Sequence, residues 1–347
     1  MRWKAKMDSF NKTKTKRALL VSVVVVLIVA IVSSSFFYLN STKPYNGPTQ
    51  SITLGATLLE STGPAFVAEQ HFFANNGLNV TVKYYDVGLN AVNAMLKGEV
   101  DMAWSAEYIL VGAALSNQKI QTIGSVAKTE FAYVVARKDR GIANISDLYQ
   151  KKIGVVRGTV MEFYLGRFLE FHGVSISDVT LVNITLAHSA DVIINGTVDA
   201  VISFPPYIEN AQQQLGGNAV VWEAQSDQML YGLITCRTEW VAQYPELVKR
   251  FLNAISQTED YMVQHPDEAK AIVQKTMNFT GDYMAVVWSR NDFSLSLDQS
   301  LVAAMENEAR WMISNNLTNK TVVPNFLDYI YLESLKSIKP ESVNIIR

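Results

Sequence analysis

One short motif occurs twice in this chain, and the repeat constrains the fold more than any other feature. The first copy reads KGEVDMAWSAE (residues 97–107) and the second reads NGTVDAVISFPPY (residues 195–207). Each copy has a glycine, then Val-Asp, then a short apolar run, which is typical of a helix end followed by a buried strand. The shared part therefore predicts a repeated structural unit. The two endings differ in chemistry, and we expect them to carry the function.

The residues around each copy alternate between strand-like and helix-like patterns in the same order. Short helical segments separate β-type runs, as expected for parallel sheets with helices on both faces. The first unit has predicted strands at 51–57, 78–86 and 100–105, with helices at 64–77 and 91–98. The second unit has predicted strands at 151–156, 178–184 and 198–203, with helices at 161–173 and 191–196.

After the second unit the pattern becomes helical, and such a tail commonly packs back onto the first unit. The strand-like segments 131–137 and 230–236 would then carry the chain between the two units. We therefore expect an α/β protein of two lobes, each with a doubly wound, mostly parallel sheet. Lobe 1 is predicted to hold residues 51–137 and 237–347, and lobe 2 residues 138–236.

The N-terminal region predicts a membrane anchor. Residues 18–39 carry no charge, and a helix of that length reaches about 33 Å, enough to cross a bilayer. Seven basic residues and one acid precede it, which predicts a cytoplasmic tail at 1–17 and an exported remainder. A cleaved signal peptide is the alternative, but the apolar run is long and no Ala-x-Ala site follows it. Residues 40–50, polar with two prolines, are predicted to form a tether.

Charge and sequons also bear on the exported part. Removing the tail leaves 23 basic against 31 acidic residues, a net charge of −8, which argues against a nucleic-acid partner. The single Cys236 excludes a disulfide framework, and we expect a monomer that packing stabilises. Eight Asn-x-Ser/Thr sequons favour a glycosylated exterior protein, at Asn40, Asn79, Asn144, Asn183, Asn195, Asn278, Asn316 and Asn319.

The candidate binding residues lie where the predicted strands end. In open parallel sheets, ligands bind beyond the carboxyl ends of the strands, beside helix N-termini. Hydroxyls, glycines, aromatic rings and charged groups at these positions suit a small polar or zwitterionic ligand. The candidates in lobe 1 are Glu60, Ser61, Thr62, Gly88, Trp104, Ser105 and Glu107. Those in lobe 2 are Arg157, Gly158, Thr159, Phe204 and Tyr207.

Each candidate also has a purely structural interpretation. The serine and threonine hydroxyls are equally typical of helix N-caps, and Glu107 also suits a cap. Trp104 could belong to the core, Phe204 to a rigid turn and Arg157 to the solvent-exposed surface. The four histidines are scattered, and no H-E-x-x-H, G-x-S-x-G, Walker A or G-x-G-x-x-G motif occurs. We therefore predict neither an enzyme nor a metal or cofactor site.

Five segments together resemble the substrate-binding proteins of ABC importers of the sulfonate, nitrate and taurine type. Binding proteins for thiamine-pyrimidine precursors share this superfamily. The segments are KGEVDMAWSAE, ISDLYQKKIGVVRGTV, LEFHGVSISDVTLVNI, NGTVDAVISFPPY and YPELVKRFLNAI. The resemblance covers about residues 51–275 and implies a two-lobed type II periplasmic-binding-protein fold, with the candidate residues above in its ligand-facing loops.

The resemblance implies a membrane-anchored, extracytoplasmic solute-binding protein that delivers its ligand to an ABC permease with its ATPase. A ligand-sensing receptor with a cytoplasmic signalling partner is the alternative. Where the family often has an acid before a proline, this chain has Pro205-Pro206, which removes an acid from the expected pocket rim. The enzyme relative that makes the thiamine pyrimidine has a cysteine-rich motif, which a chain with one cysteine lacks.

Overall fold

A computed structural model describes residues 45–225 and 228–346. The chain divides into two compact units, residues 1–47 and 48–347, and the description below concerns the second. The predicted tail, the span 18–39 and residues 40–44 of the tether, with Asn40, lie outside the described residues. Within the described ranges, no helix is both long and apolar enough to cross a membrane.

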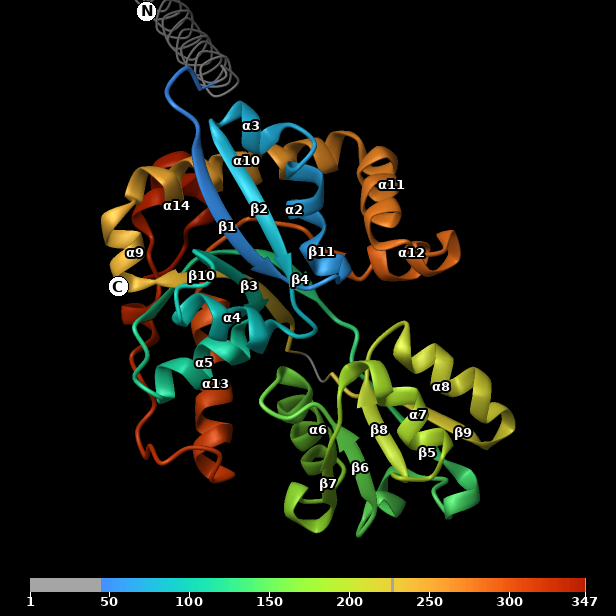
Figure 1. The fold of residues 1–347 in the computed structure, drawn as a ribbon. Helices are drawn as coiled ribbons and strands as arrows, with labels where there is room; N and C mark the ends of the chain where they lie inside the picture. The colour runs from blue at the N-terminus through green and yellow to red at the C-terminus, as the bar shows by residue number, and fades with distance from the viewer. Residues whose placement is uncertain (1–44, 226–227, 347) are drawn as a thin grey trace, which may run out of the picture. The chain divides into compact units, whose positions relative to one another are not determined.

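The first lobe is built on a six-stranded sheet with the order β11-β4-β10-β3-β1-β2 (Figure 1). β1 pairs in parallel with β2 and β3, whereas β10 runs antiparallel to both β3 and β4. Its strands are β1 (Gln50–Ala56), β2 (Leu78–Tyr84), β3 (Met102–Ala106), β4 (Ile120–Thr129), β10 (Leu230–Arg237) and β11 (Asn291–Asp292).

The second lobe has a five-stranded sheet with the order β7-β6-β8-β5-β9. β6 pairs in parallel with β7 and β8, and β5 runs antiparallel to β8 and β9. Its strands are β5 (Tyr133–Arg137), β6 (Lys152–Val155), β7 (Thr180–Asn183), β8 (Ala200–Ser203) and β9 (Ala219–Glu223). The two lobes thus share one architecture, as the repeated motif predicts.

The strand pairing differs from the expected lobe boundaries. The expected boundaries place residues 133–137 in lobe 1, but they form β5 in the second sheet, between β8 and β9. They also place residues 230–236 in lobe 2, but these lie in β10, between β3 and β4 of the first sheet. Each crossing strand is therefore inserted inside the sheet that it enters, where main-chain hydrogen bonds hold it on both sides. The crossings themselves lie between Thr129 and Tyr133 and between Glu223 and Leu230.

The repeated motif does the same structural work in both lobes. The carboxylate of Asp101 accepts hydrogen bonds from the backbone N–H and hydroxyl of Thr53 on β1, at 2.8 and 2.7 Å. The carboxylate of Asp199 accepts one from the backbone N–H of Lys152 on β6, at 2.9 Å. Gly98 and Gly196 both have a left-handed φ, of +79° and +80°, which a glycine adopts without strain. The motif therefore ends a helix and fixes the next strand against its neighbour.

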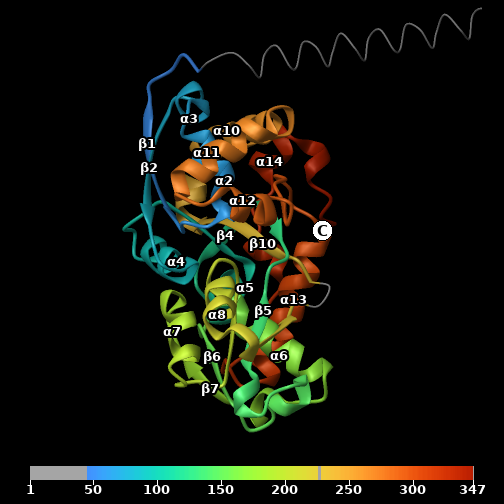
Figure 2. The ribbon, with the colours of Figure 1, turned by 90° about the vertical axis from the view of Figure 1, so that its right-hand side faces the viewer.

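Helices cover both sheets (Figures 1 and 2). Those of the second lobe are α6 (Val160–Phe171), α7 (Ser189–Ile194) and α8 (Tyr207–Leu215). Those between the first-lobe strands are α2 (Gly63–Ala68), α3 (Phe72–Asn75), α4 (Gly88–Leu96) and α5 (Glu107–Leu115). The C-terminal part adds α9 (Thr238–Gln243), α10 (Pro245–Gln264), α11 (Pro266–Met277), α12 (Gly281–Trp288), α13 (Gln299–Ser314) and α14 (Glu333–Ile338).

Helix α13 packs against both lobes. It contacts α5 in the first lobe and α6 in the second, and Figure 2 shows it between them. The ring of Trp311 meets that of Phe163 edge to face, with centroids 5.5 Å apart. A Cβ atom on Gly166 would lie 2.2 Å from the Trp311 ring, so only a glycine allows this approach. One hydrophobic core accordingly contains buried residues from both lobes.

Candidate functional site

A small cavity lies between the lobes, at the ends of strands from both sheets. Its volume is about 90 Å³, and mostly apolar side chains surround it. Residues at the ends of β1, β2 and β3 lie there opposite residues at the ends of β6 and β8. This is the position expected for a ligand site. From the first lobe it is lined by Thr57, Leu59, Ser61, Asp86, Val87, Gly88, Trp104, Ser105, Ala106, Ile109, Leu230 and Gly232. From the first crossing and the second lobe it is lined by Phe131, Val156, Thr159, Val160, Met161, Leu186 and Phe204.

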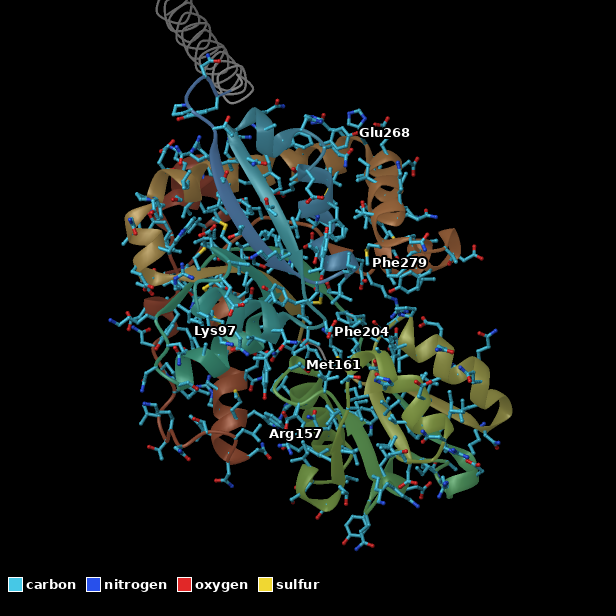
Figure 3. The ribbon with its side chains drawn as sticks, viewed as in Figure 1. Lys97, Arg157, Met161, Phe204, Glu268 and Phe279 are labelled. Carbon is cyan, nitrogen blue, oxygen red and sulfur yellow. The ribbon has the colours of Figure 1, made fainter. Side chains whose placement is uncertain are left out.

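Half of the predicted binding residues line this cavity. They come from five segments that are far apart in the sequence and that the two sheets bring together. Figure 3 shows Phe204 and Met161 where the second lobe meets the first, with Arg157 set apart from both. The predicted residues on the cavity wall are Ser61, Gly88, Trp104, Ser105, Thr159 and Phe204.

Two aromatic side chains form much of the wall. Phe204 is buried and meets Phe131 edge to face, with ring centroids 4.8 Å apart. Trp104 is only 2% exposed, and its indole Nε1 has no hydrogen-bond partner within the described part of the chain. Because a buried N–H without an acceptor is costly, this donor is a natural contact for a ligand.

A second hollow of about 240 Å³ adjoins the cavity and shares four of its residues. We call it the vestibule. Tyr207, another predicted binding residue, lines the vestibule rather than the cavity, and Asp86 lines both. The vestibule residues are Thr57, Leu58, Leu59, Tyr84, Tyr85, Asp86, Leu186 and Tyr207.

Glu60 and Thr62 do not line the cavity, because the 3-10 turn that carries them (η1, Glu60–Thr62) buries both side chains. Burial raises the pKa of Glu60 to about 7, and its carboxyl lies near the hydroxyl of Tyr283 on α12. That hydroxyl donates a hydrogen bond to the carbonyl oxygen of Pro205, at 2.9 Å. Glu60 thus lies beside a contact between the lobes instead of facing the ligand space.

Glu107 is also absent from the cavity wall. Its side chain is fully buried at the start of α5, and its Oε2 accepts a hydrogen bond from the backbone N–H of Tyr231, at 3.0 Å. The Glu107 carboxyl lies beside that of Glu308 on α13, and Glu107 Oε1 and Glu308 Oε2 have no other hydrogen-bond partner within the described part of the chain. Burial raises the pKa of both carboxyls, and the nearby Glu107 charge raises that of Glu308 further. Two adjacent buried carboxyls are stable when they share a proton.

The Glu308 carboxyl links this pair to the second crossing between the lobes. Its Oε1 accepts a hydrogen bond from the side-chain amide of Gln228 at 3.0 Å. The backbone carbonyl of Gln228 accepts one from the side-chain amide of Gln225 at 2.9 Å. The Gln225 side chain in turn donates to the carbonyl of Thr129 and to the hydroxyl of Tyr164, at 2.8 and 3.2 Å. The buried network therefore ties the crossing segment to α13 and to α6.

Arg157 and Gly158 contact a carboxylate of the protein itself. The Arg157 guanidinium holds Glu162 through Nε and Nη2, at 3.0 and 2.9 Å. The backbone N–H of Gly158 donates to the same carboxylate at 2.9 Å. Thr159, which does line the cavity, donates its hydroxyl to the carbonyl of Val156 at 2.7 Å. The loop before α6 is thus an anion site that Glu162 already occupies.

Sequence reasoning missed several cavity residues. Asp86 is the last residue of a predicted strand and precedes a predicted helix, so its position carries the same signal as the predicted binding residues. Phe131 and Leu230 lie at the crossings between the lobes. They were not predicted as binding residues because the expected lobe boundaries were wrong there. Leu186 and Gly232 carry no recognisable signal, because an apolar residue and a glycine at a strand or turn are common anywhere.

A larger hollow of about 710 Å³ lies elsewhere, bordered by α4, α5 and the residues after α13. Gly158 lines it, as do Tyr108 and the sequon residues Asn316 and Asn319. Of the described second-lobe residues only Gly158 lines it, and neither Trp104 nor Phe204 does. We therefore place the candidate site in the cavity.

The comparisons with known proteins agree with this geometry. The profile of the family described as NMT1/THI5 like matches residues 60–269, which is more than half of the chain. The chain belongs to the NMT1/THI5-like family. The matched segment contains every predicted binding residue and both crossings between the lobes.

Two curated relatives of this NMT1/THI5-like chain differ in what their names state. One, from Brucella abortus strain 2308, is named as a binding protein; it is 26% identical over 61% of this chain and 66% of its own length. The other, from Aspergillus parasiticus, is named 4-amino-5-hydroxymethyl-2-methylpyrimidine phosphate synthase. It is 27% identical over 59% of this chain and 64% of its own length. In both cases the match spans less than two thirds of the relative.

Solved structures show the fold of this NMT1/THI5-like chain. The alkanesulfonate-binding protein SsuA from Xanthomonas axonopodis pv. citri, bound to MOPS, superposes with a TM-score of 0.71 at 15% identity, covering 82% of this chain and 99% of SsuA. A ligand-binding component of an ABC-type import system from Staphylococcus aureus reaches 0.69 at 10% identity, covering 84% and 99%. The chain therefore has the two-lobed α/β fold of periplasmic binding proteins.

Proposed function

We propose that this chain is a membrane-anchored, extracytoplasmic solute-binding protein that captures a small ligand in the cavity between its lobes and delivers it to an ABC importer. The observation that carries this proposal is the cavity itself, which loops from both sheets enclose at the carboxyl ends of their strands. The family resemblance makes sulfonates, nitrate, taurine and pyrimidine precursors the first candidates. The Staphylococcus aureus structure, named as part of an ABC-type import system, supports the transport role.

The proposed mechanism is closure of the lobes around the solute. Ligand contacts on both lobes exist together only when the cleft is shut, so binding shifts the population toward the closed form. Trp104 and Ser105 contribute from the first lobe, and Thr159 and Phe204 from the second. A permease with its ATPase would then recognise the closed surface.

The proposed location rests on the sequence. Residues 18–39 are apolar and follow a basic tail, which supports a single-pass anchor with the binding unit outside. Seven of the sequons lie in the described part of the chain, and all seven asparagines are exposed, which supports glycosylation. A monomer tethered in this way stays close to its permease at high effective concentration.

Two alternatives belong to other classes. A ligand-sensing receptor would use the same cavity but report binding to a cytoplasmic signalling partner instead of a permease. An enzyme is suggested by the pyrimidine phosphate synthase from Aspergillus parasiticus. Against it, no nucleophile paired with a base lines the cavity among the described residues, and Cys236 is buried in β10.

The test is thermal unfolding of the full chain, in detergent, against taurine, alkanesulfonates, nitrate, pyrimidine precursors, amino acids and simple aromatic amines. A ligand at one hundred times its dissociation constant adds about 2.7 kcal/mol to the stability of the bound unit. We expect one class to raise the midpoint, and Phe204→Ala to abolish the shift. Phe171→Ala, at a side chain that is 77% exposed, is the matched control and should leave it intact. A shift that survives Phe204→Ala would contradict binding in the cavity.

A further inference from the structure

The charges around the cavity are of one sign. Among the described residues that line the cavity and the vestibule, Asp86 carries the only carboxylate, and there is no lysine, arginine or histidine. Asp86 lines both spaces and so lies where they join. An anionic ligand would meet this carboxylate without a compensating cation, which is unfavourable.

More acidic groups lie next to the vestibule. The pKa of the Tyr207 hydroxyl is raised, first by burial and then by the charges of Asp86 and Glu60. The charge of Glu209 on α8 also acts on Glu60 and on Tyr283. These carboxyls come from three separate elements, and Asp86 and Glu209 are exposed whereas Glu60 is buried. The negative charge of the exposed carboxylates favours a cation over an anion.

The one basic side chain among the predicted binding residues, Arg157, is neutralised within the protein. Arg157 is paired with Glu162, and that carboxylate also occupies the backbone N–H of Gly158. A sulfonate or carboxylate at this loop would have to displace a carboxylate that is held by three hydrogen-bond donors. The loop before α6 is therefore a poor receptor for a further anion.

The interior of the cavity offers one buried donor and aromatic walls. The unpartnered Nε1 of Trp104 lies 3.5 Å from the position that a Cβ atom would take on Gly232, which also lines the cavity. The absence of a side chain at Gly232 leaves space for an acceptor beside this N–H. Phe131 and Phe204 supply flat apolar surface suited to a ring.

From these four features we infer that the ligand is a small cationic amine with an apolar ring and one hydrogen-bond acceptor. The amine lies at Asp86, between the tyrosines of the vestibule, where aromatic faces also attract a cation. The ring lies against Phe131 and Phe204, and the acceptor receives the Trp104 N–H. This inference rests on the proposed function and narrows its ligand class away from plain anions.

The experiment uses three pyridines that differ in charge at one position. These are 4-(aminomethyl)pyridine, a cation, 4-(hydroxymethyl)pyridine, which is neutral, and pyridine-4-carboxylate, an anion. Benzylamine keeps the cation but lacks the ring acceptor. Calorimetric titration of the full chain measures the affinity of each. We expect the cationic pyridine to bind about tenfold or more tightly than the anion, and about fivefold more tightly than benzylamine.

Asp86→Asn is the decisive variant, because Asp86 is exposed at the opening and its replacement leaves the core intact. It should reduce the preference for the cation over the anion about fivefold. Asp191→Asn, an exposed acid on α7 outside both spaces, is the matched control and should change nothing.

The outcomes separate this inference from the proposed function. If the carboxylate binds at least as tightly as the amine and Phe204→Ala abolishes that binding, the cavity stands as the site and the cationic class is wrong. If the amine does not bind at all, the cationic class is also wrong. If the amine binds but neither Phe204→Ala nor Asp86→Asn alters its affinity, the ligand binds elsewhere and both proposals fail.

Discussion

The hydroxyl of Tyr283 donates a hydrogen bond of 2.9 Å to the carbonyl oxygen of Pro205 and so joins the two lobes. Tyr283 lies on α12 in the C-terminal part of the chain, whereas Pro205 follows β8 in the second lobe. Pro205 directly follows Phe204, which lines the cavity. A contact that holds this loop against the first lobe therefore also holds part of the cavity wall in place.

Removing this contact should favour the open form. Tyr283→Phe deletes the hydroxyl and keeps the ring, so the cost is about one hydrogen bond. We predict a larger radius of gyration in small-angle X-ray scattering and a ligand affinity lower by about two- to tenfold. Tyr261→Phe is the control, because that hydroxyl bonds to Glu268 within the helices of the first lobe. Equal scattering and affinity for both variants would show that the contact does not influence closure.

The packing of α13 on α6 gives a prediction on stability. Gly166→Ala places a methyl group 2.2 Å from the ring of Trp311, so α13 must shift. Although alanine is the better helix former, we expect a loss of about 1–3 kcal/mol in urea denaturation. Gly217→Ala is the control, because nothing lies within 4 Å of its Cβ position. A Gly166→Ala chain as stable as the wild type would mean that α13 does not pack this tightly.

The Glu107–Glu308 pair makes the stability depend on pH. The folded chain raises the pKa of both carboxyls above their ordinary value of 4.5, so it binds protons more tightly than the unfolded chain. Their contribution is complete below about pH 4.5 and is lost as the pH rises through the raised values. Glu60, with a pKa of about 7, acts in the same direction.

The variant Glu308→Gln should weaken this dependence. It removes one of the two coupled acids and retains a side chain that can meet Gln228. We predict a shallower fall in the free energy of unfolding between about pH 5 and pH 8 than in the wild type. The control is Glu306→Gln, which changes a partly exposed acid on the same helix that pairs with Arg310 and not with Glu107. Identical pH profiles for wild type and Glu308→Gln would contradict the shared proton.

The repeated motif should matter for folding and not for ligand choice. Asp101→Ala leaves the backbone N–H and the hydroxyl of Thr53 without their acceptor, and we expect it to cost about 1–3 kcal/mol. The relative affinities for the three pyridines should stay unchanged, since Asp101 does not line the cavity. Denaturation and titration on the same preparation measure both. A changed order of affinities would give the motif a direct role in binding.

The sequence predicts this fold well because the signals are local and repeated. The Gly-x-Val-Asp motif occurs at the same place in both lobes, and the alternation of strands and helices follows from periodicity. The lobe boundaries were harder. β5 and β10 are apolar strands at the crossings, and which sheet such a strand joins depends on main-chain pairing with distant partners, which periodicity does not encode.

The sequence predicts the position of the site at the strand ends, but not which of the side chains there face the cavity. Trp104 and Phe204 line the cavity because they end strands of facing sheets. Glu60, Glu107 and Arg157 lie at similar positions, but their side chains contact other residues of the protein. The partners of Glu60 and Glu107 are distant in sequence, and that of Arg157 lies on the following helix. Those partners, Tyr283, Glu308 and Glu162, are identified only by the tertiary structure.

The most direct test of the central claim is a crystal structure of the chain with the compound that stabilises it most in the thermal panel. We predict ligand density in the cavity, in contact with the Trp104 indole N–H from the first lobe and the Phe204 ring from the second. Density instead in the larger hollow beside Tyr108 and Asn316, with the cavity free of ligand, would contradict the account.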